Sequence, residues 1–197
     1  MNFADRSIML RAASRPWLVV ALLIAAASPT RAQEPDGTGL MVSAAVGRSR
    51  YALDCVGPFV CVQPSGRSSK VGVGYQFGTF GVEAWYMNFG RSEAFDTFGL
   101  EPPSDRVQIQ AAVLDAAWRW RWDRLEAALR AGLASVHHRR TRDTSTRRLS
   151  PHFGLGLGWA LTPKVTLELG WDITNGEGST GYGTTVKANS VALRVPL

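Results

Sequence analysis

Two short runs between residues 150 and 172 restrict the fold more than any other feature of the sequence. In each run, large apolar residues alternate with glycine or polar residues, and a turn around Pro163 separates the runs. Because successive side chains of a β-strand point to opposite faces, the pattern predicts a β-hairpin with one apolar face. The apolar residues are Phe153, Leu155, Leu157 and Trp159 in the first run and Val165, Leu167, Leu169 and Trp171 in the second.

The composition of the two faces indicates which solvent each of them meets. A soluble barrel turns its large apolar side chains inward, whereas a membrane barrel turns them toward lipid and places tryptophans at the headgroup level. Here tryptophans stand at the ends of the apolar face, so the hairpin is predicted to span a membrane. A soluble barrel of the lipocalin kind is the alternative. The predicted aromatic girdle consists of Trp118, Trp120, Trp122, Trp159 and Trp171.

Period-two alternation marks further runs of about ten residues, eight in all. Connections are long after the first, third, fifth and seventh runs and short after the others. Outer-membrane barrels have an even number of antiparallel strands, short periplasmic turns and long extracellular loops. The sequence therefore predicts an all-β fold, an eight-stranded antiparallel up-and-down transmembrane β-barrel with both ends in the periplasm. The runs lie near residues 40–50, 69–77, 80–90, 107–121 and 125–136, in the hairpin at 150–171, and at 185–197.

The fourth run, near residues 107–121, has a mixed face. Ile109 and Val113 share a face with Asp115. A β-bulge, or an extension of the strand beyond the membrane, would account for this mixture. A helix over residues 111–133 is the competing prediction, because alanine and arginine favour helices. The tryptophans in the run recur with a period of two, which favours a strand.

The N-terminal region has the three parts of a secretory signal. Arginines precede an apolar run at residues 17–27, and small residues follow up to Ala32. The run is too short to span a bilayer as a helix and suits the core of a signal peptide. We therefore expect a cleaved Sec-type signal peptide at residues 1–32 and one exported barrel domain at residues 33–197.

Charge and cysteine content narrow the possible partners. The net charge is +6 for the whole sequence, and residues 33–197 keep 18 basic and 15 acidic residues, or +3, which does not favour nucleic acid as a partner.

Cys55 and Cys61 are close together in the exported part. A local disulfide, contributing about 2 kcal/mol, is expected there, because a metal site would need further ligands and none is near. No cofactor is expected.

Short motifs stand in order along the exported part of the chain, at Gly47 to Ser49, Leu53 to Cys55, Gly74 to Phe77, Val82 to Ala84, Phe89, Gly90, Ser150, Pro151, Phe153, Thr162, Pro163 and Ser190 to Leu197. On these residues the chain resembles the OmpA-type small outer-membrane β-barrel family over essentially its whole exported length. The resemblance implies an eight-stranded barrel in the outer membrane of a Gram-negative envelope, with a solvated but largely plugged interior. It departs from the family at Leu197, where the assembly signal usually has an aromatic residue, and at Gly158 and Glu168, so a charge-pair gate of relatives is not carried over.

The inner face of the predicted barrel carries nearly balanced charge. Unpaired charge in a narrow lumen is costly, so the balance predicts a network of ion pairs that fills the interior. The interior of an eight-stranded barrel is only wide enough for side chains, which favours a plug. An ion path gated by the same pairs is the alternative. The predicted network consists of Lys70, Glu83, Asp115, Arg119, Arg121, Glu126, Arg130, Glu168 and Arg194.

A strongly basic segment at residues 137–148 follows the fifth run. Because guanidinium groups bind phosphate bidentately, lipopolysaccharide phosphate is one predicted partner of this segment. A solvated polar loop without a ligand is the second interpretation, and adhesion to acidic host glycans is the third. The arginines of the segment are Arg139, Arg140, Arg142, Arg147 and Arg148.

The spacing around the histidines disfavours enzymatic chemistry. In the lipid A deacylases among small outer-membrane barrels, a serine stands two residues after the histidine, beside a carboxylate. Here Gly154 stands two residues after His152, and arginines stand two residues after His137 and His138. Adjacent residues of a strand point to opposite faces, so His137 and His138 do not form a metal pair.

Together these patterns predict a non-enzymatic, monomeric outer-membrane barrel that supports envelope integrity and presents extracellular loops. Its expected partners are outer-membrane lipid and lipopolysaccharide, the barrel-insertion machinery and, in the adhesion interpretation, a host surface ligand. A small gated channel and a lipid A-modifying enzyme are the alternative functions.

Overall fold

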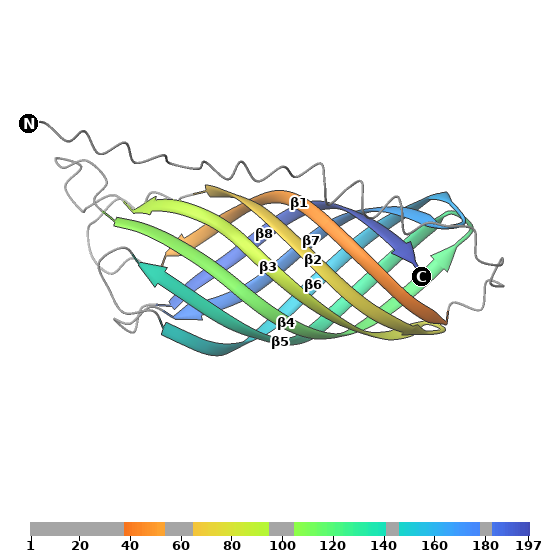
Figure 1. Cartoon of the computed structure of the whole chain (residues 1–197), viewed down its shortest axis with the longest axis horizontal. Helices are drawn as coiled ribbons and strands as arrows, with labels where there is room; N and C mark the ends of the chain where they lie inside the picture. The colour runs from red at the N-terminus through yellow and green to blue at the C-terminus, as the bar shows by residue number, and fades with distance from the viewer. Residues whose placement is uncertain (1–37, 54–64, 95–104, 141–145, 178–182) are drawn as a thin grey trace, which may run out of the picture. The chain divides into compact units, whose positions relative to one another are not determined.

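Eight antiparallel strands form one closed barrel in the computed structural model, which describes residues 38–53, 65–94, 105–140, 146–177 and 183–197. Each strand pairs with the strands before and after it in the sequence, and Figure 1 shows the resulting cylinder. The predicted eight-stranded all-β fold is confirmed. The strands are β1 (Gly39–Leu53), β2 (Ser65–Phe77), β3 (Phe80–Ala94), β4 (Asp105–Trp122), β5 (Leu125–Arg140), β6 (Thr146–Thr162), β7 (Val165–Glu177) and β8 (Gly183–Pro196).

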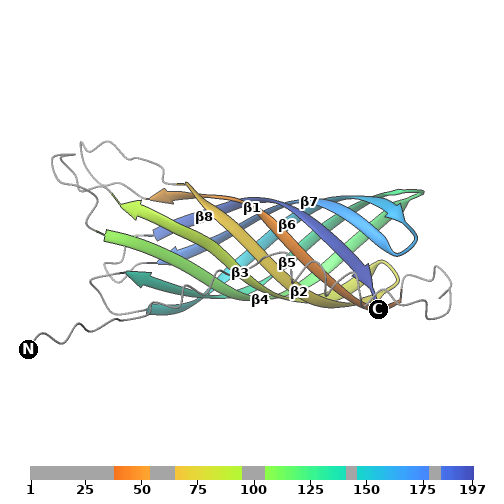
Figure 2. The same ribbon diagram turned by 45° about the horizontal axis from the view of Figure 1, so that its top comes forward.

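The first and last strands close the barrel. β1 and β8 pair over their whole common length, from Met41 opposite Pro196 to Leu53 opposite Thr184. Closure leaves no strand edge with unpaired backbone groups, which is the condition for a sheet to exist in lipid. Figure 2 shows that all strands run obliquely to the barrel axis, as closure requires.

The two ends of the barrel differ. Two-residue turns at Gly78–Thr79, Asp123–Arg124 and Pro163–Lys164 join strands at one end, here named the short-turn end. Gly78 and Asp123 have φ angles of 64° and 51°, the left-handed conformation that tight hairpin turns demand. The described chain also enters β1 and leaves β8 at this end. The opposite end, where the connections are longer, is here named the loop end.

The strands are longer than the alternation predicted. They contain 13 to 18 residues, whereas runs of about ten were expected. β5 continues to Arg140 and β6 begins at Thr146, so most of the basic segment predicted as a loop belongs to strands. A tilted strand needs about 9–11 residues to cross a bilayer. The extra residues lie mostly at the loop end, where the apolar alternation gives way to polar residues.

A helix at residues 111–133 and a bulge in β4, both considered from the sequence, are wrong. β4 pairs with β5 without interruption from Val107 to Trp122, so the segment is neither a helix nor bulged. Ile109 and Val113 point into the barrel and are buried. A register shift lies instead in β3, between Asn88 and Arg91, where Gly90 has a φ angle of 84° and its amide bonds the Asn88 side chain at 2.9 Å.

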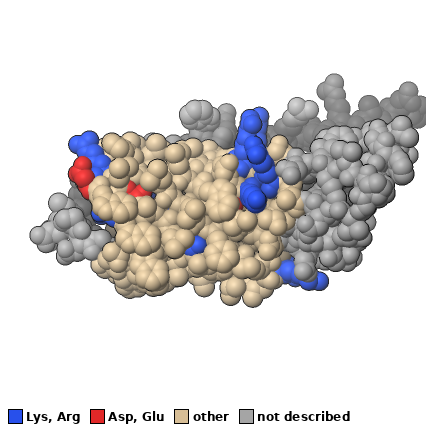
Figure 3. Space-filling model, turned by 180° about the vertical axis from the view of Figure 1, so that it is seen from behind, with Lys and Arg blue, Asp and Glu red and all other residues tan. Residues whose placement is uncertain are grey.

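The outer wall of the barrel is apolar and exposed. Among the outward side chains, Leu114, Leu133 and Leu157 are each more than half exposed. Figure 3 shows a broad surface with few charged side chains on one side of this wall. Such a continuous exposed apolar surface is far larger than soluble monomers carry. Within the described part of the chain there is no helix long and apolar enough to cross a membrane.

Candidate functional site

Six charged side chains meet inside the barrel in the half nearest the short-turn end. They come from five strands and are all nearly buried, although three are carboxylates and three are guanidinium groups. Alternation accounts for their placement, because each occupies an inward position of its strand. This ionic ring consists of Glu83 of β3, Arg119 of β4, Glu126 and Arg130 of β5, Glu168 of β7 and Arg194 of β8.

The contacts of the ionic ring form a closed cycle of alternating sign. Arg130 donates from Nε to Glu83 Oε2 at 2.8 Å and from Nη2 to Glu168 Oε1 at 2.6 Å. On the other side, Arg119 bonds Glu83 and also donates to Glu126 Oε1 at 2.7 Å.

Arg194 completes the cycle. It bonds Glu126, and its Nη1 donates to Glu168 Oε2 at 3.1 Å. Each carboxylate therefore contacts at least two arginines, and the ring carries no net charge. Charge-assisted hydrogen bonds of this kind are the strong ones, and together they offset much of the cost of burying the ions, although Arg119 Nε and Arg130 Nη1 have no hydrogen-bond partner in the described chain.

Glycines on the inner face of β6 make room for the ring. A Cβ atom on Gly156 would lie 2.9 Å from Glu168 Cδ and 3.1 Å from Arg130 Nη1, and one on Gly154 would lie 3.3 Å from Arg130 Cβ. Real Cβ atoms essentially never show the first of these distances, and the other two are tighter than most real Cβ contacts. The alternating glycines that first indicated a strand therefore leave room for long charged side chains of the neighbouring strands β5 and β7.

A second polar group occupies the middle of the lumen. Lys70 Nζ donates to Asp172 Oδ2 at 2.7 Å, and His152 is bonded through Nδ1 to Asp115 Oδ1 at 2.9 Å. His152 Nε2 lies 3.6 Å from Asp172 Oδ1, which links the two pairs. Trp85 contacts both this group and the ionic ring. Lys70 Nζ lies 4.9 Å from the centre of the Trp85 indole, and Trp85 Nε1 donates to Glu83 Oε2 at 3.0 Å.

A small cavity adjoins the middle group. It has a volume of about 10 Å³ and is lined in part by Lys70, Asp172, Ser68 and Ser190. The hydroxyls of Ser68 and Ser190 have no hydrogen-bond partner in the described chain. The space is about that of a single water molecule, and two unpaired hydroxyls beside an ion pair are suitable hosts for one.

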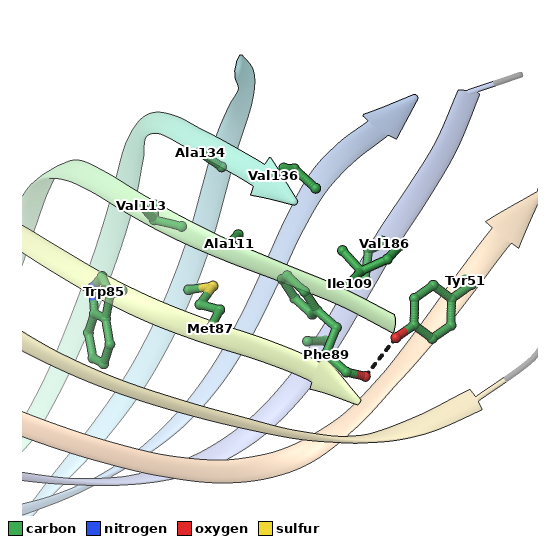
Figure 4. Packing of buried hydrophobic residues seen from close by; sticks show 11 residues of the cluster. Tyr51, Trp85, Met87, Phe89, Ile109, Ala111, Val113, Ala134, Val136 and Val186 are labelled. Carbon is green, nitrogen blue, oxygen red and sulfur yellow. Dashed lines mark hydrogen bonds between the residues drawn. The ribbon is translucent and has the colours of Figure 1, made fainter. Parts of the chain in front are cut away.

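Apolar side chains fill the lumen toward the loop end. Figure 4 shows Met87, Phe89, Ile109 and Val186 reaching inward from β3, β4 and β8. Tyr51 closes this layer by donating its hydroxyl to the Phe89 carbonyl at 2.7 Å. The apolar plug, as it is named here, consists of Tyr51, Trp85, Met87, Phe89, Ile109, Ala111, Val113, Ala134, Val136, Val186 and Ala188.

The register shift in β3 explains why Tyr51 is held at this position. Pairing of β2 with β3 ends at Ser69 opposite Asn88, so the carbonyl of Phe89 lies beyond the ladder. Ser49 Oγ donates to the same carbonyl at 2.5 Å. Two hydroxyls of β1 thus satisfy a buried backbone acceptor that the sheet does not pair.

The residues predicted for the interior network have two different locations. Eight of the nine are buried in the lumen, six of them in the ionic ring and Lys70 and Asp115 in the middle group. Arg121 is different, because its side chain is 56% exposed at the rim of the short-turn end, where it pairs with Glu126 at 3.2 Å.

Sequence reasoning missed Asp172, His152 and the apolar plug. The alternation had placed Asp172 and His152 on the inner face, which was a sufficient signal. The mixed face of β4 was the signal for the plug, since its apolar residues follow the same inward parity as Asp115.

The remaining predicted residues lie outside the lumen or outside the described residues. The girdle tryptophans all point outward and are at least 36% exposed. Arg139 and Arg147 are exposed on the outer face at the loop end, where Arg147 Nε donates to Ser135 Oγ at 2.7 Å. Arg148 is exposed, and Arg140 is the last residue of β5. Arg142, Cys55 and Cys61 lie outside the described residues.

Three layers of side chains fill the described part of the lumen. No group of histidine, cysteine and carboxylate side chains among the described residues could hold a metal ion. The ionic ring, the middle group and the apolar plug follow one another along the lumen.

Comparison with known proteins supports the architecture. The sequence matches no family model and no curated protein. Among solved structures, Neisserial surface protein A matches with a TM-score of 0.63 and 16% identity, over 81% of this chain and 97% of that one. The N-terminal β-barrel domain of Pseudomonas aeruginosa OprF matches with a TM-score of 0.50 and 16% identity, over 80% and 98% of the two chains. The fold is that of the small eight-stranded outer-membrane β-barrels.

Proposed function

We propose that this protein is a non-enzymatic outer-membrane barrel with a closed lumen, which supports the envelope and presents its loops outside the cell. The exposed apolar wall and the outward tryptophans support a lipid environment. The short-turn end then faces the periplasm and the loop end faces outward, as in outer-membrane barrels generally. The exported domain reaches this membrane through the signal peptide at residues 1–32 and the barrel-insertion machinery.

The series of barriers in the lumen is the observation that carries this proposal. A hydrated ion would have to separate the paired charges of the ionic ring and then lose its water in the apolar plug. Both steps are costly, because a charge without partners in a low-dielectric space is strongly destabilised. The two barriers differ in chemistry, since Glu83 and Arg130 belong to the ionic layer and Phe89 and Ile109 to the apolar one.

Lipid and lipopolysaccharide are the partners proposed for the outer surface. Arg139 and Arg147 lie on the outward face of β5 and β6 at the loop end, beyond the apolar positions Leu133 and Leu149. This is the height at which the phosphates of an outer leaflet would lie. A monomer is expected, because closure leaves no sheet edge for a second chain to extend.

Two measurements on one preparation test the proposal. Outer-membrane fractions are compared in SDS with and without boiling, and the purified barrel is reconstituted in a planar bilayer. A heat-dependent change in mobility together with no stepwise current supports a closed membrane barrel. Recovery of the protein in the soluble periplasmic fraction, without a mobility change, would overturn the membrane assignment.

A small gated channel is the second candidate, and one observation favours it. The inner face of β6 at Gly154, Gly156 and Gly158 offers no side chain, so movement of Arg130 would leave space along that strand. Stepwise currents in the wild-type barrel would select this candidate over the closed barrel.

A further inference from the structure

Four basic side chains gather on the outer wall of β8, β1 and β2 near the loop end. All four are exposed and point outward. Arg48 is directly opposite Arg67 in the pairing of β1 with β2, and Arg50 is directly opposite Lys187 in the pairing of β1 with β8. Arg48, Arg50, Arg67 and Lys187 are named the basic patch here.

The basic patch has no counter-charge on the described wall. Of the acidic residues whose side chains are described, five are buried in the lumen, and Asp123 lies in a turn at the far, short-turn end. None of the four basic side chains forms an ion pair with a described residue. Like charges directly opposite each other on a sheet are destabilising. An anion from outside the barrel would remove this repulsion.

An aliphatic surface begins directly below the basic patch, on the side of the short-turn end. Val46, two residues before Arg48, is 68% exposed, and Val71 and Val191 on the neighbouring strands are about half exposed. Trp171 lies at the boundary between the basic patch and the aliphatic surface. It is paired with Asn189 of β8, and Asn189 is paired with Arg48 of β1. Figure 3 shows basic side chains gathered at one place on the wall beside an uncharged surface.

We propose that the basic patch binds the phosphate groups of a phosphorylated glycolipid in the outer leaflet, with its acyl chains against the valines below. Guanidinium groups bind phosphate bidentately, and two opposed arginines can share one phosphate. The open, exposed site lacks the enclosure that would retain a free phosphate, whereas a lipid gains apolar contact on the same surface. This inference rests on the membrane location proposed above and assigns one phosphate site within it.

Unfolding by urea in vesicles tests the assignment. The barrel is refolded in phosphatidylcholine vesicles, alone or containing lipid A that carries both phosphates, or dephosphorylated lipid A. The test variant is R48Q/R67Q. Its control is R124Q/K164Q, which removes the same charge from exposed positions in two short turns.

The proposal predicts that R48Q/R67Q differs from wild type in opposite directions in the two membranes. The quantity compared is the free energy of unfolding. Without lipid A, R48Q/R67Q is at least as stable as wild type, because the like-charge contact is gone. With phosphorylated lipid A, wild type and R124Q/K164Q gain stability, and the gain corresponds to binding at least about tenfold tighter than in R48Q/R67Q. A merely structural role for the two arginines would lower stability in both membranes.

Three results would overturn the assignment. The first is that lipid A stabilises R48Q/R67Q as much as wild type, and the second is that dephosphorylated lipid A stabilises wild type as much as the phosphorylated form. The third is that inorganic phosphate at the same concentration suppresses the stabilisation by lipid A, which would indicate a site for the free ion. The mobility change on boiling is measured on the same samples. If it persists while the lipid A gain is absent, only the patch assignment fails and the membrane barrel stands.

Discussion

Replacement of Arg130 by methionine is expected to be the most informative single change in the lumen. The side chain is 1% exposed and donates two charge-assisted hydrogen bonds, to Glu83 at 2.8 Å and to Glu168 at 2.6 Å. Such bonds contribute about 1.5–3 kcal/mol each, and removing one partner of a buried ion pair costs about 3–5 kcal/mol. Both carboxylates keep other arginines, so we expect a loss near the lower limit, about 3 kcal/mol.

The assay is equilibrium unfolding in urea with the barrel in lipid vesicles, followed by tryptophan fluorescence. R124M removes an exposed arginine in a turn and is expected to change the unfolding free energy by no more than about 0.5 kcal/mol. The double variant R130M/E168Q restores the neutrality of the ring, so it should recover about 1 kcal/mol relative to the sum of the single changes. If R130M were as stable as R124M, the ring would not be the stabilising network inferred from its contacts.

Three further changes probe the other layers by the same unfolding assay. Tyr51→Phe removes the hydroxyl that donates to the Phe89 carbonyl at 2.7 Å. A loss of about 1 kcal/mol is expected, because Ser49 still donates to that carbonyl; no loss would mean that the Ser49 hydroxyl satisfies the carbonyl alone. Gly156→Ala places a Cβ atom 2.9 Å from Glu168 Cδ, so a loss of about 1–3 kcal/mol from overpacking is expected, and a gain in stability would contradict it. Phe89→Ala should cost about 3–5 kcal/mol without producing current in a planar bilayer, because the ionic ring still closes the lumen; a stepwise current would show that the plug alone seals it.

The sequence was enough to predict the strands and whether each side chain points into the barrel or out of it. Side chains such as Glu83 and Arg130 could be placed in the lumen because alternation in a strand leaves only two directions. The eight-stranded count followed from the same pattern, and its closure is seen in the pairing of β1 with β8.

Alternation does not give the height of a residue in the barrel or its neighbours on other strands. The ionic ring closes only in the observed registers, with Arg130 opposite Gly154 and Glu168 opposite Gly158. Arg121 has inward parity, yet it lies at the rim, because the pattern does not mark where the lumen ends. The opposition of Arg48 and Arg67 was likewise invisible until β1 and β2 were aligned.

The mixed face of β4 shows a different limit. A rule that sends polar residues inward and apolar residues outward holds only within the bilayer. Ile109 and Val113 lie beyond the ionic ring toward the loop end, where the lumen is filled by apolar packing instead. There the usual burial of apolar side chains applies again, and the inner face resembles a soluble core.

The pairing of β1 with β8 has a consequence for how the protein forms. Met41 is paired with Pro196, so the cylinder is complete only after the last strand has joined the sheet. Every shorter intermediate carries two open sheet edges and an apolar wall, both of which promote aggregation in water. Contacts between residues so distant in sequence form slowly. We therefore expect assembly of the barrel to be all or none, without a stable intermediate that lacks β8.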